Sequence, residues 1–241
     1  MQLSARMERL ASKVRKGSWL ADVGTDHGYI PIALVLRGVI PTAVAMDVNP
    51  GPLQRAAEHI RERGLSTYID TRLSDGLSAL EAGEADTVLI AGMGGALTAR
   101  ILDGGEHCLW AVEELILQPQ SEIYLVRQWL WEHKYRIVEE DIVLDGGKYY
   151  PMMKAVHGES QEPGEAELYY GSADRQKSPE VFEAYIRNEL RKNENIRSRL
   201  KEHGQEDSAR MGELEKEKCR LEEALSGISR QKRGETEYEM Q

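Results

Sequence analysis

The chain has 241 residues, of which 41% are hydrophobic, and its formal net charge is −10. This length suits one α/β domain with an appendage, and the acidic balance excludes a uniformly basic nucleic-acid binder, although not a local basic patch. Its two cysteines, Cys108 and Cys219, have the spacing of neither a metal site nor a disulfide framework. The first residues are too polar for a signal peptide, and no apolar run is long enough to span a membrane. We therefore expect a cytoplasmic protein with no metal and no membrane contact.

Residues 1–158 are predicted to alternate between strands and helices, which is typical of a Rossmann-like α/β fold. A first helix, capped by Ser4, should run to about Val14. Strands are expected at 19–23, 43–46, 67–72, 87–90, 114–117, 135–144 and 149–156. Helices are expected at 52–63, 96–102 and 123–133, with shorter ones beginning near residues 27–30 and ending at residue 80. The Asp-Gly-Gly sequence at 145–147 predicts a hairpin turn, so the sheet should be seven-stranded and mostly parallel, with one antiparallel strand.

The composition changes after residue 158, and three further segments are predicted. These are a linker at 159–177, a helical hairpin at 178–230 and a flexible tail at 231–241. In the second helix of the hairpin, residues recur at heptad spacing: Met211, Leu214, Lys218, Leu221, Leu225 and Ile228. The turn at 204–207 suits an antiparallel coiled-coil hairpin. The same stripe could pair two copies of the chain, so we expect a monomer, with a dimer through the hairpin as the alternative.

The turn between the first strand and the following helix has the pattern D-x-G-x-D-x-G, from Asp22 to Gly28. A nicotinamide dinucleotide would need glycine where Asp26 stands, because a carboxylate there repels the pyrophosphate. Two carboxylates suit a cofactor with a cationic centre and no phosphate. The helix N-terminus near His27 suits a carboxylate group of the same cofactor. The pattern therefore predicts S-adenosylmethionine, with Gly24 providing the tight turn.

Acidic residues also follow the next two strands. Asp47 can accept hydrogen bonds from both ribose hydroxyls, and Asp75, in a Ser-Asp-Gly turn, can accept one from the adenine amine. Both could instead simply cap the helices that follow. The fourth strand ends in small residues and a methionine, which favours close approach of the backbone to a ligand. The expected cofactor-binding residues are Asp22, Gly24, Asp26, His27, Gly28, Asp47, Val48, Asp75, Gly76, Ala91, Gly92 and Met93.

These features stand within a nearly continuous set of motifs over residues 3–172: LSARMERLASKV, ADVGTDHGYIP, AMDVN, SDGL, IAGMGG, LILQPQ, DGGKYY and ELYYGS. With them, the chain resembles the bacterial tRNA (adenine-22-N1)-methyltransferase family. The resemblance implies a class I methyltransferase fold with a C-terminal helical hairpin. It also implies methyl transfer from S-adenosylmethionine to N1 of an adenine in the D-arm region of tRNA.

The chemistry of this reaction suggests two catalytic residues. N1 of adenine has a free lone pair at neutral pH, so no strong base is needed before attack, whereas the methylated ring is cationic and needs a nearby anion. We assign that role to Asp26 and expect Tyr29 to stack on the base. Gln118 and Gln120 could read the adenine edge, or could merely form the turn around the proline between them.

Basic residues in two regions are candidate contacts to tRNA phosphates, although each could equally be a solvated surface charge. They are Arg6, Arg9, Lys13, Arg15 and Lys16 in and just after the first helix, and Arg187, Arg191, Lys192, Arg197, Arg199 and Lys201 in the hairpin. Two other functions stay open on the residues alone. One is a methyltransferase acting on a small molecule or protein, and the other is a non-catalytic module that binds the cofactor and a protein partner.

Overall fold

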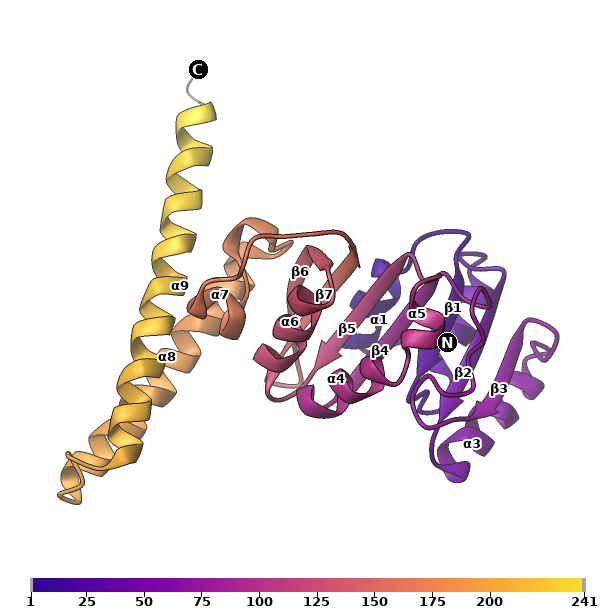
Figure 1. Ribbon diagram of the computed structural model, residues 1–241, viewed down its shortest axis with the longest axis horizontal. Coiled ribbons are helices and arrows are strands. Elements are labelled where there is room, and N and C mark those ends of the chain that lie inside the picture. Colours follow the sequence, from indigo (N-terminus) through magenta and orange to yellow (C-terminus); the bar gives the residue numbers. More distant parts are fainter. Residues whose placement is uncertain (1, 240–241) are drawn as a thin grey trace. The chain divides into compact units, whose positions relative to one another are not determined.

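The structure, a computed structural model, describes residues 2–239, with side chains up to residue 229. The chain divides into two compact units. The sheet unit comprises residues up to 138 together with 143–160, and the hairpin unit comprises residues 139–142 and those from 161 onward. Figure 1 shows the strands of the one and the paired helices of the other.

The sheet has seven strands in the order β3-β2-β1-β4-β5-β7-β6. They are β1 (Trp19–Val23), β2 (Thr42–Asp47), β3 (Ile69–Leu73), β4 (Thr87–Met93), β5 (Glu114–Pro119), β6 (Tyr135–Asp145) and β7 (Lys148–His157). Strands β1 to β5 pair in parallel, and β7 runs antiparallel to β5. The prediction of a mostly parallel seven-stranded sheet with one antiparallel strand is confirmed.

The central strands are buried on both faces, which explains their continuous apolar sequences. Every residue of β5 is buried, and so are all residues of β1 after Trp19. Successive residues of a strand face opposite sides, and the core accordingly forms two clusters. Leu115 and Leu117 belong to one cluster and Ile116 to the other.

The helices of the sheet unit are α1 (Ala5–Lys13), α2 (Tyr29–Leu36), α3 (Pro50–Glu62), α4 (Gly95–Asp103), α5 (Glu106–Leu109) and α6 (Ile123–Glu132). The Ser4 hydroxyl accepts a hydrogen bond from the Met7 amide, so the predicted cap is confirmed. The prediction of a short helix ending at residue 80 is wrong, because this segment forms turns. Gly76 has a left-handed φ of 59°, and the Ser74 hydroxyl binds the backbone of both Gly76 and Ala79 in place of helical bonds.

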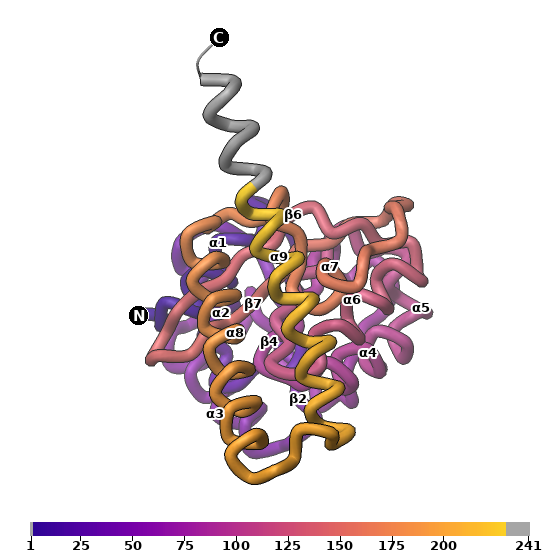
Figure 2. Tube along the Cα trace, turned by 90° about the vertical axis from the view of Figure 1, so that its left-hand side faces the viewer, coloured from indigo at the N-terminus to yellow at the C-terminus, as the bar shows by residue number. Residues whose placement is uncertain are grey.

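The hairpin unit consists of α7 (Glu165–Tyr170), the short helix η1 (Ala173–Arg175), α8 (Pro179–Glu202) and α9 (Ala209–Glu239). Helices α8 and α9 pack against each other, as Figure 2 shows. Leu214 and Leu221 of the predicted stripe are fully buried. Asn193 of α8 is also buried, and its amide donates to the Leu214 carbonyl (2.9 Å) and to the Glu217 carboxylate (3.0 Å). A buried asparagine of this kind fixes the alignment of two helices.

Two boundaries of this unit differ from expectation. The segment 159–177, expected to be a linker, contains α7 and η1, and α7 packs against α9. Ala166 and Tyr170, one helical turn apart, are both buried, a pairing too short to stand out in the sequence. The predicted hairpin ends at residue 230, but the backbone of α9 continues to Glu239. The side chains of the predicted flexible tail, 231–241, lie outside the described part of the chain. Across residues 2–239, no helix combines the length and apolar character that crossing a membrane requires.

Candidate active site

A cleft of about 390 Å³ opens in the sheet unit, at the edge where the parallel strands end. In open α/β sheets this edge is where ligands bind. Its lining comes from α1, α2 and α4, from the ends of β1, β2 and β4, and from the segments that follow strands β1 to β5. The lining residues are Arg6, Met7, Leu10, Asp22, Val23, Gly24, Asp26, Tyr29, Ile30, Asp47, Val48, Asn49, Ser74, Ala91, Gly92, Met93, Leu97 and Gln120.

Most of the predicted site residues line this cleft, and several do not. Those that line it are Asp22, Gly24, Asp26, Tyr29, Asp47, Val48, Ala91, Gly92, Met93, Arg6 and Gln120. Those that do not are His27, Gly28, Asp75, Gly76, Gln118, Arg9 and Lys13. The neighbour Ser74 lines the cleft in place of Asp75, which is exposed. Because the spacing of a turn does not reveal which side chain turns inward, the sequence did not distinguish the two.

Lys13 was expected to face RNA, and that expectation is wrong. Its exposed fraction is only 6%, because the end of α1 packs against β7. The Lys154 ammonium of β7 donates to the Lys13 carbonyl at 3.0 Å. The basic character of this helical face therefore does not extend to its last turn.

Two buried carboxylates, Asp22 and Asp47, dominate the electrostatics of the cleft, with exposed fractions of 7% and 8%. Burial raises the pKa of Asp22 to about 6; the adjacent Thr25 hydroxyl acts in the lowering direction, and the charge of Asp47 raises the pKa further. The Thr25 hydroxyl, itself buried, meets no partner with full hydrogen-bond geometry in the described structure, and burial of Asp22 outweighs its effect. Asp47 accepts the Asn49 amide at 2.7 Å. A site that desolvates carboxylates in this way favours a cationic ligand.

The glycine turn is held close to the neighbouring strands. The amides of Gly24 and Thr25 both donate to the Met46 carbonyl, at 2.8 and 2.9 Å. Gly24 has a φ of 76°, and a Cβ atom there would lie 2.2 Å from the Met93 Cε. Any larger residue would therefore force Met93 out of the cleft wall and strain the turn.

Asp26 and Tyr29 lie on the rim of the cleft and are supported by two residues of α3. An Asp26 carboxylate oxygen lies 3.3 Å from His27 Nε2 and 3.7 Å from an Arg55 guanidinium nitrogen. The His27 ring stacks on Tyr29 and on His59, with centroid separations of 5.1 and 5.4 Å. Arg55 and His59 were not predicted as site residues, although their spacing of four places them on one helical face.

The two glutamines at the end of β5 have different roles. Gln118 is fully buried, and its side-chain oxygen accepts a hydrogen bond from the Arg6 guanidinium at 2.9 Å. Gln118 therefore orients Arg6, and its complete burial does not favour base reading, which was one of the two interpretations of this segment. Gln120 is exposed and lines the cleft, and its side-chain oxygen accepts from the Lys148 ammonium at 3.2 Å.

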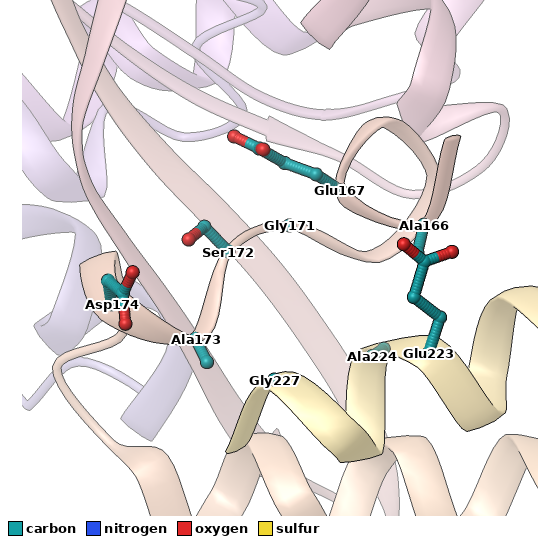
Figure 3. A pocket seen from close by; sticks show the side chains of 9 residues that line it. All are labelled: Ala166, Glu167, Gly171, Ser172, Ala173, Asp174, Glu223, Ala224 and Gly227. Atoms are coloured by element: carbon teal, nitrogen blue, oxygen red, sulfur yellow. The ribbon is translucent and has the colours of Figure 1, made fainter. Parts of the chain in front are cut away.

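The hairpin unit has a separate cavity of about 420 Å³, shown in Figure 3. It is lined mostly by small residues, together with the carboxylates of Glu167, Asp174 and Glu223. Glu167 is already paired with Arg175. The part of the chain with described side chains holds no group of three metal-ligating residues suited to a metal ion. Among the described residues, none of the predicted site residues lines this cavity, whereas many of them line the cleft of the sheet unit.

Comparisons with known proteins identify the family of the chain. The family model described as tRNA (adenine(22)-N(1))-methyltransferase matches residues 20–224. The Bacillus subtilis protein of that name is 38% identical over 159 residues, covering 66% of this chain and 67% of that protein. The structure of Streptococcus pneumoniae Sp1610 with S-adenosyl-L-methionine is 35% identical, covers 93% of this chain and 100% of the other, and has a TM-score of 0.81.

The structure of M. capricolum TrmK with S-adenosyl-homocysteine has a TM-score of 0.84 at 25% identity, covering 95% of this chain and 100% of that one. Similarity of this extent spans both the sheet unit and the hairpin unit. The family model likewise covers well over half of the sequence, including all seven strands except the first residue of β1. The chain therefore belongs to the tRNA (adenine(22)-N(1))-methyltransferase family.

Proposed function

We propose that the sheet-unit cleft binds S-adenosylmethionine and that the chain uses it to methylate N1 of adenine 22 in tRNA. Membership of the family and the cofactor-bound relatives support the reaction and the cofactor. The observation in this chain that carries the proposal is the pair of buried carboxylates, Asp22 and Asp47, at the ends of adjacent strands. When bound, S-adenosylmethionine supplies an electrophilic methyl group on a cationic sulfur.

Each end of the cleft suits one part of this cofactor. Asp47 at the end of β2 is suited to accept the ribose hydroxyls, as acidic residues do at the same strand end in dinucleotide folds. Ser74, at the end of β3, lies at the adenine end. Asp22 at the end of β1 is suited to the cationic amino acid end, where a positive group would offset its desolvation.

The target base enters from the side of β4 and β5. The sheet order runs β3-β2-β1-β4-β5, so the ribose end over β2 and β3 leaves the β4 and β5 side for the substrate. A base in a helical stem must leave its stack to reach the cleft. We assign Asp26 to stabilising the cationic ring of the product, with His27 and Arg55 holding its carboxylate. Tyr29, stacked on His27, forms the rim beside it.

The direct test is to incubate the protein with S-adenosylmethionine and unmodified tRNA and to map the methylated base by nuclease digestion and mass spectrometry. We expect 1-methyladenine at position 22, and none in a matched transcript with guanosine there. In Asp26→Ala, we expect methyl transfer to be lost while calorimetry still detects cofactor binding. Methylation at another nucleotide, or only of a small molecule or protein, would refute the substrate; retained activity in Asp26→Ala would remove Asp26 from the chemistry.

We also propose a cytoplasmic monomer, because tRNA is modified in the cytoplasm of bacteria and the heptad stripe of α9 packs against α8 of the same chain. Light scattering with size-exclusion chromatography tests the oligomeric state. A dimer at micromolar concentration would contradict it.

A further inference from the structure

The β6–β7 hairpin turn lies beside the cleft. Strand β7 runs antiparallel to β5, with Leu117 opposite Met153, so β7 begins at the edge where β5 ends. The first residues of β7, Lys148 to Tyr150, thus lie beside the segment that follows β5. The hydrogen bond from Lys148 to Gln120, a cleft-lining residue, joins this turn to the cleft.

Tyr150 has two cations against its ring. The Arg6 guanidinium carbon and the Lys148 ammonium nitrogen each lie 5.3 Å from the ring centroid. These distances suit cation–π attraction. One cation comes from α1 and the other from β7, so a single half-buried ring brings together residues far apart in the sequence.

Two further contacts hold Arg6 in this position. Its guanidinium donates to the buried side-chain oxygen of Gln118 at 2.9 Å. Its backbone amide, in the first turn of α1, donates to the Asp145 carboxylate at 3.1 Å. Asp145 is the last residue of β6, so it fastens the hairpin turn to the start of α1.

The two cations differ from most other basic residues in the chain. Among the described residues, neither Arg6 nor Lys148 forms an ion pair with a carboxylate, and their side-chain partners are neutral: Gln118, Gln120 and Tyr150. The Asp145 carboxylate accepts the backbone amide of Arg6 and forms no ion pair with either cation in the described structure. Both cations lie against the same ring without a carboxylate partner, so an anion that reaches both would be attracted by two charges.

We infer that Arg6 and Lys148, held by Tyr150, bind a phosphodiester of the RNA strand next to the adenosine being methylated. The inference rests on the proposed function. An arginine fork and a lysine point charge both suit phosphate oxygens. Phosphate contacts position a nucleic acid, and a hold on the adjacent backbone would keep the strand in place while a base leaves its stack. The ring of Tyr150 positions the two cations, whereas Tyr29 and Gln120 line the cleft itself.

The test compares four variants with the unaltered full chain in tRNA binding, measured by fluorescence anisotropy at several salt concentrations. Lys148→Ala and Lys148→Gln both remove the charge, and Gln retains a donor for Gln120. We expect each to raise Kd on the order of tenfold and to lower the slope of log K against log salt by about 0.7 to 0.9. Tyr150→Leu should weaken binding several-fold, and Tyr150→Phe, which keeps the ring, should not.

Arg136→Ala is the matched control. Arg136 is an exposed cation of the same hairpin, near the start of β6 and so at the opposite end of that strand from the turn. We expect its variant to keep the Kd and the salt slope of the unaltered chain. Calorimetry with S-adenosylmethionine shows whether the sheet unit of each variant is folded, and Lys148→Arg should restore most of the salt slope.

The outcomes separate this inference from the proposed function. If the unaltered chain methylates adenine 22 but both Lys148 variants bind tRNA with its affinity and slope, the inference is overturned and the proposed function stands. Weaker binding with an unchanged slope also overturns it, because the lost contact is then not ionic. If the unaltered chain neither binds nor methylates tRNA, the proposed function itself fails.

Discussion

The two units of the chain use charged residues in opposite ways. In the hairpin unit, many basic side chains are paired with glutamates, although Arg191, Arg199 and Lys201 have no ion pair in the described structure. The pairs include Arg175 with Glu140, Arg187 with Glu183, Lys192 with Glu189, Arg197 with Glu215 and Arg220 with Glu165. In the cleft of the sheet unit, Asp22 and Asp47 are buried without an ion-pair partner among the described residues. Paired charges hold helices in place, whereas unpaired ones suit a ligand of opposite charge.

This difference makes some of the candidate tRNA contacts less favourable than others, because a paired cation is less available to a phosphate. Arg187, Lys192 and Arg197 of α8 were predicted as phosphate contacts, and each already has a carboxylate partner. Binding a phosphate there would have to compete with that carboxylate. Arg6, which has no such competitor in the described structure, stands at the mouth of the cleft. The hairpin as an RNA-binding element stays a prediction.

The strongest way to separate the two units is to damage the core of the hairpin alone. Phe182 in α8 is 1% exposed, and Phe182→Ala should lower the free energy of unfolding of the hairpin unit by about 3–5 kcal/mol. We expect hydrogen exchange to rise in α8 and α9 while calorimetry gives an unchanged affinity for S-adenosylmethionine. Ile196→Ala, at a position 39% exposed, is the control and should cost under about 1 kcal/mol. Loss of cofactor binding in Phe182→Ala would mean that the units do not fold independently.

The second test concerns the cost of the unpaired carboxylate. The pKa of Asp22 is raised in the folded state, from 3.8 to about 6, so its stabilising contribution is fully present below about pH 4 and is lost as the pH rises through about 6. Without cofactor, Asp22→Asn should therefore be more stable than the unaltered chain at pH 8, by up to roughly 3 kcal/mol, and nearly equal at pH 4. Urea unfolding at several pH values measures this.

The same variant should bind S-adenosylmethionine on the order of 100-fold more weakly at pH 8, because a charged contact is lost. Stability and affinity would then change in opposite directions. If Asp22→Asn is less stable than the unaltered chain at every pH, the Asp22 carboxylate stabilises the fold. It would then not be an unpaired charge kept for a ligand, in contrast to the paired charges of the hairpin unit.

A smaller effect is expected at the junction between the hairpin turn and α1. Asp145→Ala removes the acceptor for the Arg6 amide at the N-terminus of α1 and should cost about 1 kcal/mol of stability. Asp145→Asn keeps an acceptor and should cost less. Thermal unfolding with bound cofactor compares the two, and equal stability of Asp145→Ala with the unaltered chain would rule out this cap.

The smallest effect is expected from a paired charge on α8. Lys192→Ala breaks the bridge to Glu189, which is 2.7 Å long and three residues away on the helix surface. It should change stability by no more than about 0.5 kcal/mol and leave tRNA affinity within twofold. Glu189→Ala is the reciprocal control. A clear loss of tRNA affinity in Lys192→Ala alone would show that α8 binds RNA despite its ion pairs.

Local patterns in the chain were sufficient to predict the alternation of strands and helices, the glycine turn and the acidic strand ends at Asp22 and Asp47. These features depend on hydrophobic periodicity and turn chemistry, which act over a few residues. The heptad stripe of α9 likewise predicted a helical hairpin. The interpretation of Asp26 in place of a glycine led to S-adenosylmethionine, the cofactor bound to a relative.

Contacts between distant segments decided the rest. The packing of α1 on β7 buries Lys13, and the turn after β3 directs Ser74, not Asp75, into the cleft. Lys148 reaches Gln120, and Tyr150 reaches Arg6, only because β7 runs antiparallel beside β5. Strand order and direction arise from the balance of burial over the whole sheet, so no local pattern could predict which cations meet at the mouth of the cleft.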